Sequence, residues 1–206
     1  MALTVFRGGW TAAAAQAVAR LRHPRELIES LVVDSLVQSR PDADGGLHFS
    51  MLETVREFAR EQLVPAHARE LRQRHRDWFL ALARDARASH DLVDEVTHAN
   101  LLAGIASALD DGEPAQAVQL ALPMFKQWMS QGSAPQVRAV LGRLAAALSP
   151  RTPGDVSFLC ALARLLMQAG ESAEARRLAE RAKAMTDGES DPETLADAYY
   201  THARVV

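Results

Sequence analysis

The run LVQSRPDADGGLHFSM, residues 36–51, carries the strand signal of this chain. Leu47, Phe49 and Met51 alternate with polar residues, and residues 36–39 form a second short run before the turn-rich segment 41–46. Two runs of strand character separated by Pro, Asp and Gly are typical of a β-hairpin. We therefore predict a hairpin over residues 36–51.

Helical signals lie on both sides of this hairpin. Thr11 is a good N-cap for a helix through the alanines to about Arg20, and a second helix begins near Pro24. The spacing of the second helix predicts one apolar face, made of Leu27, Ile28, Leu31 and Val32. After the hairpin, the pattern Ser50-x-x-Glu53 predicts a capping box. The helix that follows runs through Val55, Phe58, Ala59 and Leu63 and should end at Pro65.

Helical segments followed by a two-stranded hairpin are the order of a winged helix. We predict a winged-helix domain over residues 1–66, with residues 40–46 as the wing. From residue 67 onward the hydrophobic period is helical throughout. We expect breaks near residues 111–114, 131–133, 149–154, 170–171 and 187–188. Such short loops favour antiparallel helical hairpins. The expected fold class is mainly α.

The helical region shows an internal repeat. Aligning Gly132 with Gly170 places Val137, Leu141 and Leu144 over Ala175, Ala179 and Ala182, an offset of 38 residues. This offset is near the 34 residues of a tetratricopeptide (TPR) repeat. A further copy begins near Asp191, with an inner face predicted at Leu195, Ala198, Tyr199 and His202. We therefore predict a TPR-like domain over residues 67–206, whose last repeat is incomplete.

Composition excludes several classes of protein. The chain has 206 residues, is 48% hydrophobic and 24% charged, and has a net charge of −3, which is an ordinary globular profile. It contains neither 18 consecutive apolar residues nor a signal-peptide pattern, so we expect a soluble cytoplasmic protein without a membrane partner. Its single cysteine, Cys160, cannot form an internal disulfide or a cysteine-based zinc site.

The sequence contains no recognisable catalytic pattern. Its two lysines, Lys126 and Lys183, do not follow a glycine-rich phosphate-binding loop, and the G-x-S-x-G and H-E-x-x-H patterns do not occur. His67 and His75 would lie about 12 Å apart along one helix, too far for one metal ion. We expect a protein that is not an enzyme, with no catalytic, cofactor-binding or metal-binding residues.

Four motifs, in this order, resemble one family: LTVFRGGWT (residues 3–11), LVVDSLV (31–37), MLETVREFA (51–59) and RHRDWFL (74–80). Residues 2–148 are similar to the region after the nucleotide-binding domain in bacterial STAND-class signal-transduction ATPases. Many of these are transcriptional regulators of the LuxR or antibiotic-regulator type. The resemblance implies a winged helix followed by TPR-like repeats, and an ATPase site that is not on this polypeptide. We expect the chain to be a piece of a longer protein.

The resemblance implies a regulatory role in signal transduction. The repeats would bind a protein partner or effector, and the winged helix would relay this binding to the ATPase domain of the parent protein. Candidate partner contacts are Phe125, Trp128, Tyr199 and Tyr200. Core packing is the alternative role for Phe125 and Trp128. Tyr199 and Tyr200 point in different directions on a helix, so we expect one exposed ring, which could also contact a second copy of the chain.

Two other functions compete with this interpretation. Winged helices commonly bind DNA, but the helix before the hairpin carries Glu26, Glu29 and Asp34 against one Arg25. Asp42 and Asp44 make the wing acidic too. Because phosphates would be repelled at both places, DNA is the less favoured partner. A free-standing TPR scaffold without an ATPase partner is the third interpretation.

Overall fold

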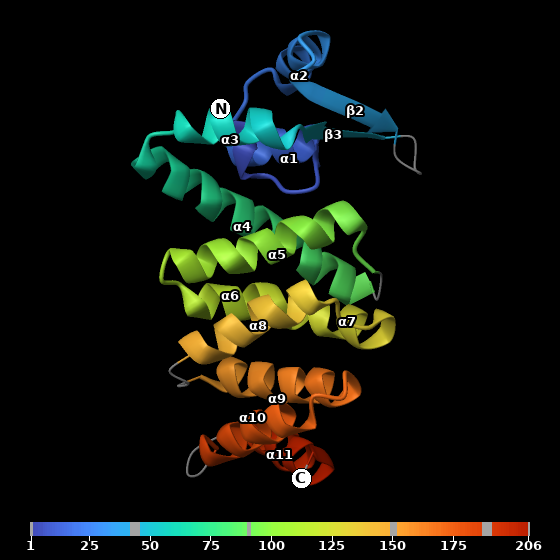
Figure 1. Ribbon diagram of the computed structural model, residues 1–206, viewed down its shortest axis with the longest axis vertical. Helices are drawn as coiled ribbons and strands as arrows, with labels where there is room; N and C mark the ends of the chain where they lie inside the picture. Colours follow the sequence, from blue (N-terminus) through green and yellow to red (C-terminus); the bar gives the residue numbers. More distant parts are fainter. Residues whose placement is uncertain (1, 42–45, 90–91, 149–151, 187–190, 206) are drawn as a thin grey trace. The chain divides into compact units, whose positions relative to one another are not determined.

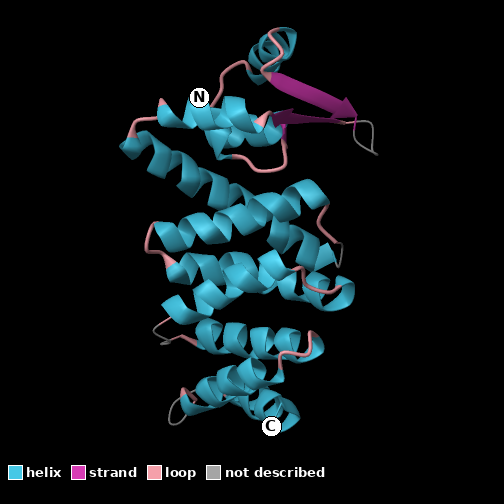
Figure 2. Cartoon of the chain, in the orientation of Figure 1, coloured by secondary structure: helices cyan, strands magenta, loops and turns pink. Residues whose placement is uncertain are grey.

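The computed structural model describes residues 2–41, 46–89, 92–148, 152–186 and 191–205 (Figure 1). The protein is mainly helical, and its small antiparallel sheet lies near the N-terminus (Figure 2). This confirms the expected fold class, mainly α with an N-terminal hairpin. The chain forms two compact units, which divide between Ser107 and Ala108. The predicted boundary between the winged-helix and TPR-like domains, at residues 66/67, is a different kind of boundary and is not tested by this division. It stays a prediction.

The first unit contains the whole sheet. Its elements are η1 (Ala2–Val5), β1 (Trp10–Thr11), α1 (Ala12–Ala19), α2 (Pro24–Val33), β2 (Val37–Pro41), β3 (Leu47–Met51), α3 (Glu53–Glu61), α4 (Pro65–Ser89) and most of α5 (Glu95–Asp110). The sheet order is β1-β3-β2, with β2 and β3 paired from Val37↔Met51 to Pro41↔Leu47. The predicted hairpin is therefore confirmed for these strands, while wing residues 42–45 lie outside the described residues.

Three details of the first unit differ from the prediction. Residues Trp10 and Thr11 form a third strand, too short to leave an alternating pattern. The capping box at Ser50 is wrong, because Ser50 pairs with Gln38 in the sheet and Leu52 precedes the first turn of α3. The predicted helix end at Pro65 is wrong, because α3 ends at Glu61 and Pro65 opens α4, where proline suits the first turn.

The core of the first unit is an aromatic cluster between the N-terminal segment and α4. Phe6 stacks on Trp10 at 5.4 Å between ring centroids and meets His75 and Phe79 edge-on. Thr11 caps α1 as predicted, because its Oγ1 accepts the backbone N–H of Ala14 at 3.2 Å. The cap and the cluster together fix residues 6–14 against the rest of the unit.

The second unit is built of helices only among its described residues. They are the end of α5, α6 (Pro114–Ala121), η2 (Leu122–Met124), α7 (Phe125–Gln131), α8 (Pro135–Ala147), α9 (Pro153–Gln168), α10 (Ser172–Ala184) and α11 (Pro192–Val205). Gly132 and Gly170 both turn the chain at positive φ, 79° and 82°, and the six positions paired by the predicted repeat are all buried. The expected breaks near residues 111–114 and 131–133 imply one long helix between them. Pro123 interrupts that helix, and the structure has α6, η2 and α7 in its place.

Candidate interaction surfaces

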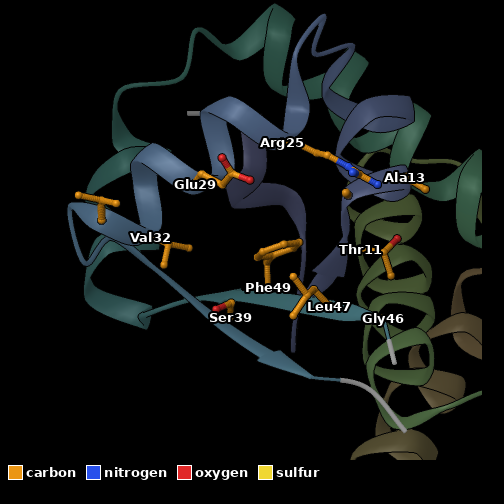
Figure 3. Close-up of a pocket in the computed structure, with 11 residues that line it drawn as sticks. Thr11, Ala13, Arg25, Glu29, Val32, Ser39, Gly46, Leu47 and Phe49 are labelled. Carbon is orange, nitrogen blue, oxygen red and sulfur yellow. The ribbon is translucent and has the colours of Figure 1, made fainter. Parts of the chain in front are cut away.

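A concave surface of the first unit lies between α2, the start of α1 and the sheet, and we call it the α2–hairpin groove. Its volume is about 670 Å³. Figure 3 shows side chains that line it. Its apolar lining is Ala12, Ala13, Val32, Val33, Leu47 and Phe49. Its polar lining includes Thr11, Arg25, Glu29 and Ser39. All these residues belong to one compact unit.

The groove exists because α2 is poorly covered. The predicted apolar face of α2 is wrong in part: Ile28 is buried, but Leu27 is 43% exposed. Val33, at the end of the helix, is 83% exposed. On the sheet side, Leu47 and Phe49 lie two residues apart and so share one face of β3. Apolar side chains from α2 and β3 are thus left open to solvent on two sides of the groove.

Two charged side chains project from successive turns of α2 into this groove. Figure 3 shows Arg25 directed toward Ala13 on α1, while Glu29 lies between Arg25 and Val32. Neither Arg25 nor Glu29 forms a hydrogen bond or ion pair with another described residue, although a spacing of four residues would allow them to pair. The groove therefore presents one cation and one anion beside an apolar floor.

α3 also has an uncovered apolar residue. The predicted face through Val55, Phe58 and Ala59 is only partly correct, because Phe58 is 64% exposed and no residue of α3 is fully buried. Arg7 bridges to this helix through Glu53, whose carboxylate lies 3.0 Å from the guanidinium. A surface ion pair thus joins α3 to the N-terminal segment, while Phe58 is left open to solvent.

Phe125 and Trp128 lie in the core of the second unit. Their exposed fractions are 7% and 2%, and their rings meet edge-to-face at 5.3 Å between centroids. Phe125 also contacts Phe158 of α9. Phe125 and Trp128 therefore pack in the core, which was the alternative to their predicted role as partner contacts.

Tyr199 and Tyr200 are both exposed, where the sequence predicted one exposed ring. Lys183 lies 5.1 Å from the ring centroid of Tyr199, and Arg204 donates a hydrogen bond to the Tyr200 hydroxyl at 3.1 Å. The inner face of α11 is made of Thr194, Ala198, Thr201 and Val205. The predicted inner face is therefore wrong at Tyr199 and Leu195, which turn outward. Partner contact by Tyr199 and Tyr200 stays a prediction.

Asn100 is a buried polar centre that the sequence did not reveal. Its Oδ1 accepts the backbone N–H of Arg7 at 2.8 Å, and its amide donates to the carbonyls of Gly9 and Val96. His75 Nε2 lies 2.9 Å from the same Oδ1. Burial lowers the pKa of His75 to about 4, so the neutral ring donates to Asn100. These bonds hold the N-terminal segment on α4 and α5.

Further chemistry is sparse among the described residues. They contain no group of three or more His, Cys, Asp or Glu side chains placed to hold a metal ion. Cys160 is buried in α9, and burial raises the pKa of its thiol to about 11, which disfavours the reactive thiolate. None of the helices within these residues has the length and apolar character needed to span a membrane.

Comparison with known proteins gives one line of similarity. No family model matches the chain, and no solved structure matches it. Three curated proteins are similar to it, one from Mycobacterium bovis and two from strains of Mycobacterium tuberculosis, each named "Putative HTH-type transcriptional regulator". Each is 31% identical over 140 residues, a region that covers 63% of this chain. The match takes in 16% of the length of these relatives.

Proposed function

We propose that this chain is a non-enzymatic regulatory segment of a STAND-type transcriptional regulator. In this proposal the TPR-like repeats bind a protein partner or effector, and the winged helix relays that binding to an ATPase domain elsewhere in the parent protein. The observation that carries the proposal is the 31% identity to proteins named transcriptional regulators. The match covers 16% of their length. The four motifs that resemble STAND proteins support it.

The uncovered side of α2 is our proposed relay surface. A helix that buries one residue and exposes Val33 and Leu27 gains stability when another surface covers it. If this surface binds one conformational state of the ATPase domain and not the other, its binding shifts the equilibrium between the two states. Tyr199 and Tyr200 on α11 are the proposed contacts for a protein partner or a second copy of the chain.

The relay is tested on the protein encoded by the complete reading frame. We expect that frame to encode a glycine-rich loop ending in Gly-Lys-Ser or Gly-Lys-Thr. Val33→Asp places a charge on the relay surface and should change the rate of ATP hydrolysis at least threefold. Arg22→Gln, an exposed change just before α2, serves as the matched control and should leave the rate unchanged. An unchanged rate in Val33→Asp, or a frame without the loop, contradicts the proposal.

The name of the relatives favours DNA binding as a second candidate. The charge on α2 opposes it, because Glu26, Glu29 and Asp34 are all exposed beside Arg25. A gel-shift titration at about 50 mM and 200 mM salt separates the two, since phosphate contacts weaken steeply with salt. The regulatory-segment proposal predicts no shifted band at 50 mM salt. A salt-sensitive shift would instead establish DNA binding.

A further inference from the structure

Two opposite charges that have no partner among the described residues line the α2–hairpin groove at a defined spacing. Arg25 and Glu29 are four residues apart on α2, which separates them by about 6 Å along the helix axis. Both lack an ion pair or hydrogen bond within the described part of the chain, and both line the groove. Because both side chains are long and flexible, a ligand that matches this surface needs an anion and a cation about 6–10 Å apart.

The rest of the groove is apolar. Val32 and Val33 line it from α2. Leu47 and Phe49 line it from β3 (Figure 3). Leu47 is 54% exposed, so a ligand here would remove apolar surface from water. The volume of about 670 Å³ lies within the range of small-molecule sites. It is several times the size of one amino-acid side chain.

We propose that this groove binds a short apolar peptide whose two ends are free. The C-terminal carboxylate would pair with the guanidinium of Arg25, and the N-terminal ammonium with the carboxylate of Glu29. The apolar side chains of the peptide would cover Val33 and Leu47. A simple fatty acid fits less well, because it satisfies Arg25 but sets its apolar tail against Glu29. This inference concerns the isolated chain and does not rest on the proposed relay.

The test uses trileucine and two capped forms of it. The 206-residue chain is titrated with each peptide while backbone amide shifts are followed by NMR. Trileucine should give saturable shifts at Ala13, Val33 and Leu47. N-acetyl-trileucine lacks the ammonium and trileucine amide lacks the carboxylate. Because exposed ion pairs contribute up to about 1 kcal/mol, each capped peptide should bind about threefold to fivefold more weakly.

Two variants assign each end of the peptide to its partner. In Arg25→Gln the amide and the free peptide should bind equally, since the carboxylate has lost its partner. In Glu29→Gln the acetylated and free peptides should bind equally for the same reason at the other end. Arg22→Gln removes an exposed arginine outside the groove and should behave as the unchanged protein. All three positions are exposed, so the fold should be preserved.

Several results would overturn this inference. A titration with trileucine that gives no saturable shifts at Ala13, Val33 and Leu47 contradicts the site. Equal affinity for trileucine and both capped forms contradicts the ion pairs, as does binding that Arg25→Gln and Glu29→Gln leave unchanged. Hexanoate binding as tightly as trileucine would point to an acid site instead. Each of these outcomes leaves the ATP-hydrolysis test of the relay unaffected.

Discussion

His75 Nε2 lies 2.9 Å from Asn100 Oδ1, and both side chains are buried in the first unit. The pair joins α4 to α5 across 25 residues of sequence. Asn100 also holds Arg7 and Gly9, more than 90 residues away along the chain. This one side chain therefore ties the N-terminal segment, which carries β1 and leads into α1, to the helices that follow the sheet.

We expect Asn100→Ala to destabilise the protein by about 2–4 kcal/mol. The change leaves the Arg7 N–H, the Gly9 carbonyl and the His75 N–H buried without their partner, and each such group costs about 1–3 kcal/mol before relaxation. Urea unfolding followed by circular dichroism measures the change. Gln62→Ala, an exposed change after α3, should stay within about 0.5 kcal/mol. Equal stability of the two variants would contradict the role given to Asn100.

Stability should fall with acid through His75. Its pKa is lowered from 6.5 to about 4 in the folded protein, because burial disfavours the charged ring. The unfolded chain therefore binds the proton more readily. The stability that the neutral His75 ring contributes is fully present above pH 6.5 and is lost as the pH falls from 6.5 to about 4. A shift of this size corresponds to up to about 3 kcal/mol at low pH.

Unfolding free energies measured between pH 7 and pH 4 test this dependence. His75→Gln should lose the part of the pH dependence that the histidine supplies, although the variant is less stable throughout. His67→Gln changes an exposed histidine on the same helix and should keep the full slope. The same pH profile in His75→Gln and in the unchanged protein would show that His75 is not the titrating group.

The glycines offer a pair of changes with opposite expected signs. Gly170 has φ 82° and its N–H donates to Met167 as α9 ends, a conformation that costs other residues about 1–2 kcal/mol. Gly170→Ala should therefore destabilise the second unit by about 1 kcal/mol. Gly142 lies inside α8, where an added Cβ meets no atom within 4 Å. Gly142→Ala should stabilise the unit by about 0.5–1 kcal/mol. Thermal unfolding of both variants checks the signs. A more stable Gly170→Ala would refute the turn geometry, and a less stable Gly142→Ala would refute the free space at that position.

Cys160 should be unreactive until the protein unfolds. Its side chain is fully buried and the pKa of its thiol is raised to about 11. We expect labelling by a disulfide reagent at pH 8 to be at least a hundredfold slower in the native protein than in urea. Ser89→Cys, at the exposed end of α4, supplies a reactive thiol for comparison. Equal labelling rates at the two positions would place Cys160 at the surface.

The sequence predicted elements whose signal is local and periodic. Alternation over residues 47–51 located β3, and the offset between Gly132 and Gly170 located equivalent buried positions. The sequence could not reveal β1, because two residues show no period, or Asn100, whose partners lie far along the chain. It also assigned a covered face to α2, because spacing shows which residues share a face but not whether another element packs on it.

Titration of the 206-residue chain with Mg-ATP, followed by calorimetry, tests whether this polypeptide itself carries a nucleotide site. The proposed function holds that this polypeptide recognises partners and that any nucleotide site lies on another part of the parent protein. It predicts no saturable heat of binding up to about 1 mM ATP, a level at which a site of about 10 µM affinity would be almost fully occupied. Saturable binding in the micromolar range would contradict it.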